Sequence, residues 1–232
     1  TATTDLYTFS LHDALPIFID CTFEVMGGLQ LIDYALLKHA DGDWLSNFQA
    51  PDQDGDLRIR NMSWWRSPAM PATALVIGNP RMDDKGWENH FKSAAGSLPI
   101  MLGDPRRLTQ EDRIKYSSYA SWMETMQKKY DIMSYRQDLP GYGEPAEGHW
   151  DGFSRINTET GEGGIIGIFR HGAHEDERIV VVDYLDPEKT YEVKTIGGES
   201  IARMNGKDLK TTGFKIRLEN LYSGELLEVS SR

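Results

Sequence analysis

Polar side chains of several chemical types gather around two short apolar segments near the start of the chain. Carboxyl groups can exchange protons with a substrate, amide and guanidinium groups can bind its hydroxyls, and indole can stack on the apolar face of a sugar ring. Such a mixture within a few dozen residues is typical of a small-molecule site. The set comprises Asp20, Cys21, Asp33, Asp43, Trp44, Asn47, Asp52 and Arg58.

Strands and helices alternate through the first half of the sequence, which places these residues on βα units. Runs of β-forming residues at 18–23, 43–47, 72–77 and 98–102 predict short strands. Apolar periodicity predicts helices at 29–38, 58–66, 87–95 and 109–130, and the acidic residues and glycine at 51–55 predict a loop. Alternation of this kind favours a parallel sheet.

One helix start has a local signature. Thr109 followed by Asp112 forms a near capping box, in which an aspartate takes the place of the usual Glu or Gln. Apolar residues then recur at helical spacing to about Tyr130. We therefore expect a long helix that begins directly after Thr109.

The second half of the sequence changes in character. Residues 137–149 are rich in proline and glycine and predict a linker. Beyond it, strands are expected at regular short spacing, which favours an antiparallel β-sandwich. The predicted organisation is a leader (1–17), a βα unit (18–136), the linker (137–149) and a C-terminal sandwich (150–232). The expected strands are 150–156, 164–169, 178–182, 191–195, 214–218 and 226–229.

Composition excludes several classes of partner. The net charge of −11 over 232 residues opposes binding to nucleic acid or to anionic membranes, since both require a basic surface. No apolar run approaches the roughly 18 residues that span a bilayer. The single cysteine, Cys21, excludes an internal disulfide.

Residues 1–17 have no lysine or arginine and so lack the basic start of a secretory signal. The segment resembles the translated read-through of a sequencing adapter, and a genuine strand-like terminus is the alternative. On the first interpretation the natural protein is longer, of metagenomic origin, and its true N-terminal part is missing.

The ordered motifs resemble the alpha-galactosidase-like glycoside hydrolases of families 36 and 27. Those families carry Asn-Cys on a strand, a glycine cluster, a following aspartate, and Trp-x-Ser-Asp on the next strand. Later segments resemble the last barrel strand with its helix and the appended sandwich of these enzymes. The matching residues here are Asp20-Cys21, Gly27-Gly28, Asp33, Trp44-Leu45-Ser46-Asn47, Ser97–Asp104 and Leu108–Asp112.

This resemblance implies the C-terminal half of a (β/α)8 barrel, with about four βα units, followed by a small antiparallel sandwich. It further implies a retaining glycosidase that uses two carboxyl groups and needs no cofactor or metal. The family's nucleophile lies on an earlier strand, so we expect this chain to lack it and to be inactive alone. Because Asn47 occupies the place of the family's acid, the acid is left open between Asp43, Asp52 and neither.

Each acid candidate has one argument on either side. Asp43 lies beside an aromatic residue, where burial would raise its pKa, but it precedes its strand and so faces the wrong end of the barrel. Asp52 lies in the loop expected to rim the site, but that loop of Asp, Gln and Gly is also typical of a solvated turn.

The remaining site residues keep a structural alternative. Sugar contacts are implied for Asp20, Cys21, Asp33, Trp44 and Asn47, although Cys21 and Trp44 also suit a core and Asp33 a solvated helix. Arg58 and Arg60 either bind a hydroxyl or carboxylate or lie on a solvated face, which we favour. His171 and His174 are expected to be solvated turn residues rather than metal ligands.

Three hypotheses follow. The first is a hydrolase fragment that binds a carbohydrate substrate, and the second is a non-catalytic carbohydrate-binding protein with a degenerate barrel. The third is a structural sandwich with an adventitious helical lead. If the barrel is cut, the strand at 18–23 presents an open edge, and we expect homo-oligomers or non-specific association through it.

Overall fold

The computed structural model describes residues 20–22, 37–45, 52–77 and 81–232, and for residues 20–22 and 52–54 it describes the backbone alone. Asp33 and Asn47, and most of the helix predicted at 29–38, therefore lie outside the described residues. None of the helices within the described ranges is both long and apolar enough to cross a membrane.

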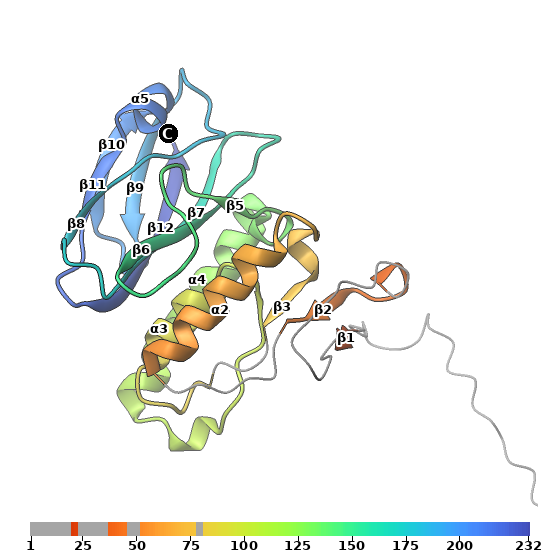
Figure 1. The fold of residues 1–232 in the computed structure, drawn as a ribbon. Helices are drawn as coiled ribbons and strands as arrows, with labels where there is room; N and C mark the ends of the chain where they lie inside the picture. Colours follow the sequence, from red (N-terminus) through yellow and green to blue (C-terminus); the bar gives the residue numbers. More distant parts are fainter. Residues whose placement is uncertain (1–19, 23–36, 46–51, 78–80) are drawn as a thin grey trace, which may run out of the picture.

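Four short parallel strands pair in chain order, and the first three are labelled in Figure 1. Their pairing aligns Asp43 with Leu75 and Val76 with Leu98. The prediction of a parallel α/β unit at the front of the chain is thus confirmed, with strands shorter than the sequence suggested. The strands are β1 (Asp20–Thr22), β2 (Gly42–Trp44), β3 (Leu75–Ile77) and β4 (Leu98–Pro99).

Helices connect these strands and begin where the strands end. They are α2 (Asp52–Arg66), α3 (Trp87–Ala94) and α4 (Gln110–Tyr130), with short 3-10 turns η1 (Ala72–Ala74), η2 (Pro105–Arg107) and η3 (Ile132–Ser134). The loop predicted at 51–55 is wrong, because α2 already begins at Asp52. Acidic residues in the first turn of a helix interact favourably with its dipole, which outweighs their preference for turns.

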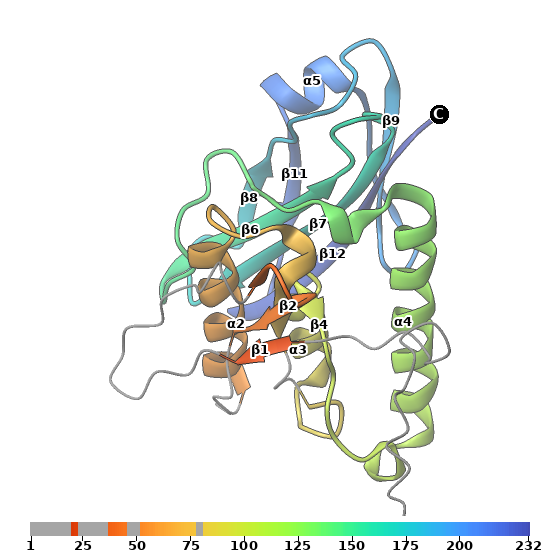
Figure 2. The same ribbon diagram turned by 90° about the vertical axis from the view of Figure 1, so that its right-hand side faces the viewer.

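The capping signature of α4 is confirmed. The Thr109 hydroxyl oxygen accepts from the Asp112 backbone N–H at 3.0 Å, and the hydroxyl donates to the Asp112 carboxylate at 2.7 Å. At the other end Asp131 closes the helix in the left-handed conformation, with φ of 54°. The helix therefore spans the predicted range (Figure 2).

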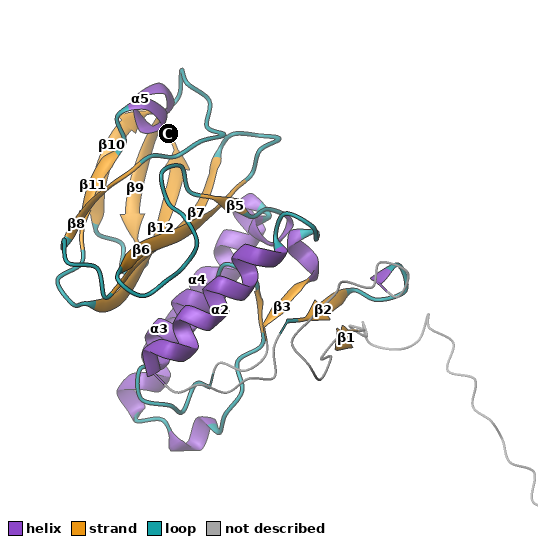
Figure 3. Cartoon of the chain, viewed as in Figure 1, coloured by secondary structure: helices purple, strands orange, loops and turns teal. Residues whose placement is uncertain are grey.

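A six-stranded antiparallel sheet forms the second half of the chain (Figure 3). The strand order in this sheet is β10-β9-β12-β7-β6-β5, and β11 pairs with β8 in a separate small sheet. All six strands predicted from the sequence are present in one sheet or the other, whereas β5, β10 and α5 were not predicted. The elements are β5 (Gln137–Asp138), β6 (His149–Ile156), β7 (Gly163–His171), β8 (Glu177–Val180), β9 (Thr190–Thr195), β10 (Ser200–Asn205), α5 (Gly206–Thr211), β11 (Phe214–Arg217) and β12 (Tyr222–Ser231).

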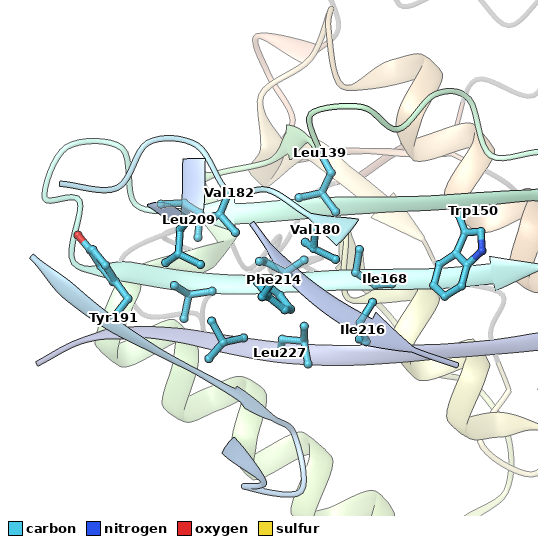
Figure 4. Close-up of a cluster of buried hydrophobic side chains, with 14 of the residues drawn as sticks. Leu139, Trp150, Ile168, Val180, Val182, Tyr191, Leu209, Phe214, Ile216 and Leu227 are labelled. Carbon is cyan, nitrogen blue, oxygen red and sulfur yellow. The ribbon is translucent and has the colours of Figure 1, made fainter. Parts of the chain in front are cut away.

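The large sheet is buried on both faces. On one face Ile166 and Ile168 pack with the β8–β11 sheet and α5, through residues such as Val180 and Phe214 (Figure 4). On the other face Ile165 and its neighbours pack against α3 and α4. This second cluster crosses the predicted linker, so the two halves of the chain share a core. The predicted domain boundaries remain predictions.

Arg155 connects the two halves of the chain through hydrogen bonds inside their shared core. Its guanidinium lies fully buried on β6 and donates to the carbonyl oxygens of Ala95 at 2.8 Å and Ser97 at 2.7 Å, just beyond α3. It also donates to Tyr135 at 2.9 Å. Burial, with repulsion from Arg136, lowers the pKa of Arg155 to about 9. The cation is thus solvated by carbonyl groups at a helix C-terminus, where positive charge is favoured.

We predict that Arg155→Met strongly destabilises the protein, because the carbonyls at the end of α3 lose their donors inside the core. The expected loss in free energy of unfolding is about 3 kcal/mol, measured by urea denaturation. Arg203→Met on the partly exposed strand β10 is the matched control and should change stability little. Equal effects of the two substitutions would contradict this role.

Candidate functional site

The carboxyl edge of the parallel sheet is the place where the topology gathers chemistry-bearing residues. Helix α2 follows β2, α3 follows β3 and α4 follows β4, so the three helices begin at the edge where the strands end. Active sites of parallel α/β proteins lie at this edge. The backbone of Asp52, the first residue of α2, is there.

Strand register separates the two faces of this sheet. Asp43 is paired with Leu75, and Leu75 belongs to the apolar cluster with Leu45 and Ile77 that residues of α2, such as Ile59, cover. Side chains alternate along a strand, so Asp43 lies on the helix-covered face. The half-buried Trp44, paired with Val76, lies on the opposite face.

Asp43 is a buried carboxyl group, and few hydrogen bonds replace the water that it loses on burial. It is 3% exposed, and its Oδ1 has no hydrogen-bond partner. Burial raises the pKa of Asp43 to about 6, against the attraction of Arg66. Arg66 ends α2, whereas Asp52 begins it, so Asp43 lies toward the amino edge of the sheet. This position favours a structural role for Asp43.

The other predicted site residues are only partly placed. Asp20 and Cys21 are on β1, in register with Gly42 and Asp43. Arg58 is exposed on α2, consistent with either alternative considered for it. Their roles in binding remain predictions, as do those of Asp33 and Asn47.

A buried polar cluster joins α2 and α3 to the six-stranded sheet. Arg60 donates to both Asp151 carboxylate oxygens, at 2.7 and 3.1 Å, and to the Ser93 hydroxyl at 2.8 Å. Its guanidinium also lies 4.3 Å from the centroid of the Phe169 ring. The favoured interpretation of Arg60 as solvated is wrong, since it is 4% exposed.

His171 extends this cluster and is likewise buried, which corrects its interpretation as a solvated turn residue. Arg60 Nη2 lies 3.2 Å from His171 Nδ1, and a guanidinium can only donate, so Nδ1 accepts and the ring is neutral. Burial and the Arg60 charge lower the pKa of His171. Nε2 lies 3.3 Å from Glu147 Oε2 but outside hydrogen-bonding geometry. His174 is exposed, as expected.

These contacts join elements from both halves of the chain. His90 pairs with Asp56, so α2 and α3 are linked to each other as well as to β6 and β7. The partners are separated by 34 residues in one pair and 91 in the other, so no local pattern in the sequence indicates them. Among the described residues, no group of three His, Cys, Asp or Glu could hold a metal ion.

We predict that Asp43→Asn stabilises the protein at neutral pH. The pKa of Asp43 is raised on folding, so its contribution is favourable below about pH 4 and is lost as the pH rises through about 6. The increase in free energy of unfolding relative to wild type should therefore be larger at pH 8 than at pH 4, by up to about 3 kcal/mol. Urea denaturation at the two pH values measures it.

Glu159→Gln, which removes a charge from an exposed turn, is the control and should show no such pH dependence. A destabilising effect of Asp43→Asn at pH 8 would mean that the ionised carboxylate has a stabilising partner, contrary to the account above.

The fold is similar to that of solved glycoside hydrolases. GH36 alpha-galactosidase AgaA from Geobacillus stearothermophilus superimposes with a TM-score of 0.68 at 13% identity, covering 85% of this chain and 27% of that chain. The alpha-galactosidase from Lactobacillus brevis gives 0.64 at 12%, with the same coverage. The galactosidase domain of the alpha-galactosidase-sucrose kinase AgaSK gives 0.63 at 14%, again over 85% and 27%.

No family model matches the sequence, and neither does any curated protein. The resemblance to alpha-galactosidase-like glycoside hydrolases is thus confirmed as a likeness of fold. The chain spans about a quarter of the length of these structures.

Proposed function

We propose that this chain forms the leaving-group side of a retaining alpha-galactosidase-like glycoside hydrolase. The observation that carries the proposal is the shared fold: most of the chain, parallel strands and antiparallel sheet together, superimposes on GH36 alpha-galactosidases. Because fold alone does not fix function, the arrangement of the candidate residues must be consistent with the same activity.

The four parallel strands are interpreted as the C-terminal half of a (β/α)8 barrel. They follow one another in chain order, and α2 covers one of their faces. The opposite face, with Trp44 and Val76, would then line the barrel interior. We interpret the six-stranded sheet and the β8–β11 sheet, which share a core, as the appended β-sandwich.

Asp52 is the better candidate for the general acid. A retaining glycosidase needs a carboxylic acid within reach of the departing oxygen, at the carboxyl ends of the barrel strands. Asp52 is the first residue of α2, the helix that follows β2, and its backbone lies on that edge. Asp43 has a suitably raised pKa, but it lies on the face beneath α2, where a barrel holds no substrate.

The attacking carboxylate is expected on an earlier strand that this sequence does not contain. The chain alone would then bind and protonate the leaving group but could not form the glycosyl intermediate. In the part of the chain that the structure describes, β1 pairs only with β2, and association through its other edge is part of this proposal.

Oligosaccharides with a terminal alpha-galactoside are the proposed substrates. Substituted forms of the Geobacillus AgaA enzyme have been solved with raffinose and with stachyose, both neutral oligosaccharides. The acidic composition of this chain suits a neutral ligand rather than an anionic one. No cofactor or metal is part of the proposed reaction.

A non-catalytic carbohydrate-binding protein is the second candidate. Asn47 supports it, because an amide at the family's acid position cannot donate a proton as a carboxylic acid does. On this reading the polar edge of the sheet binds sugar without cleaving it.

Azide can test the catalytic proposal by replacing the missing nucleophile. Azide attack on phenyl alpha-galactoside forms a C–N bond as the C–O bond breaks, and the acid protonates the departing phenol. We predict no turnover without azide. With azide present, beta-galactosyl azide should form, and chromatography measures its appearance. Asp52→Asn should reduce this rate by about 10²-fold or more, whereas Asp43→Asn should leave it nearly unchanged.

A 4-nitrophenyl leaving group, which needs little protonation, is the internal control and should make the rate insensitive to Asp52→Asn. Turnover without azide would contradict the absence of a nucleophile. Galactoside binding with no azide product would favour the non-catalytic candidate instead.

A further inference from the structure

One buried imidazole lies between two side chains of opposite charge. His171 is on β7, in register with His149 of β6 and with Tyr222 of β12, whose ring stands edge-on to it at 5.1 Å between centroids. Its Nδ1 faces the Arg60 guanidinium at 3.2 Å, and its Nε2 faces the Glu147 carboxylate at 3.3 Å. The two ring nitrogens therefore respond differently to a change in protonation.

The contact with Arg60 exists only while the imidazole is neutral. Arg60 is held in place by both carboxylate oxygens of Asp151 and by the Ser93 hydroxyl, and its guanidinium keeps its charge at any ordinary pH. Since Nδ1 accepts from Arg60, the proton of the neutral ring is on Nε2, and a second proton has to bind Nδ1. That proton would point at the Arg60 N–H groups and bring two cations together inside the protein.

Glu147 offers the protonated ring a different partner. Its Oε1 accepts from the Tyr222 hydroxyl at 2.8 Å, and its Oε2 is the oxygen that faces His171 Nε2. The side chain is 62% exposed, so it has room to adjust toward the ring. The Gly148 backbone N–H donates to the His171 carbonyl oxygen at 2.8 Å, which keeps segment 139–148 beside β7 whatever the charge of the imidazole.

The other ionisable groups around the ring do not remove this conflict. They are Asp56 of α2, which pairs with His90 of α3, Asp151 of β6, which pairs with Arg60, and the exposed His149. Burial and the Arg60 charge lower the pKa of His171 below its ordinary value of 6.5, against the attraction of Glu147, Asp151 and Asp56. The folded protein thus disfavours the imidazolium, although a carboxylate lies next to it.

We propose that His171 is an acid-sensitive switch: on protonation, its imidazole leaves Arg60 of α2 and pairs with Glu147 of segment 139–148. Because the neutral ring is favoured on folding, its contribution to stability is complete above about pH 6.5 and is lost as the pH falls below that value. Acid therefore weakens the junction between α2 and the six-stranded sheet. This regulation goes beyond the proposed function and does not depend on it.

Imidazole 15N NMR of the whole chain tests the switch without any substitution. At neutral pH, His171 should show the tautomer that carries its proton on Nε2. On acidification its titration midpoint should lie below that of the exposed His174, which serves as a reference in the same spectrum. A proton on Nδ1 at neutral pH, or a midpoint at or above that of His174, would overturn the proposal.

His171→Asn provides the matching test of stability, because its amide oxygen can accept from Arg60 in place of Nδ1 but does not titrate. Between pH 7.5 and pH 5.5, the unfolding equilibrium constant from urea denaturation should rise more in wild type than in this variant, by up to about tenfold. The control, His174→Asn, should keep the pH dependence of wild type.

Glu147→Gln should make the loss of stability in acid larger, because the carboxylate that favours the imidazolium is removed while an acceptor for Tyr222 remains. Equal pH dependence of wild type and His171→Asn would show that the imidazole is not the acid-sensitive group. An unchanged or smaller loss in Glu147→Gln would show that Glu147 is not its second partner, and either result contradicts the exchange proposed here.

Discussion

The junction between the parallel strands and the antiparallel sheet depends on buried arginines. Arg60 pairs with Asp151 across it, and Arg155 donates to carbonyl groups beyond α3. Both cations are removed from water and hydrogen-bonded, so any shift of α2 or α3 against β6 would leave a buried charge or carbonyl without its partner. Apolar packing brings the two halves together, and these contacts fix their register.

This constraint sets the geometry of the candidate site. Helix α2 is held by Arg60 against the sheet of the second half, and its first residue, Asp52, is thereby kept at the carboxyl edge of the parallel strands. The same helix buries Asp43 beneath it. Asp52 and Asp43 thus occupy different positions relative to this helix, one at its first residue and the other beneath its apolar face.

The sequence predicted the features that depend on neighbouring residues. Thr109 and Asp112 lie within one turn, so the start of α4 could be read directly. The parallel strands and six of the later strands follow from runs of β-forming residues. Arg60 and His171 could not be assigned, because their burial depends on partners from distant elements. The start of α2 was missed because Asp, Gln and Gly favour turns locally, and packing against α3 is not visible locally.

Native-state hydrogen exchange at increasing urea concentration tests most directly whether the two halves form one cooperative body. The amides of β3, within Leu75–Ile77, and of β7, within Ile165–Phe169, should merge into a single global opening with the same free energy. If β3 instead exchanges through an opening several kcal/mol smaller, while β7 stays protected, the buried arginine junction does not couple the halves and the account is wrong.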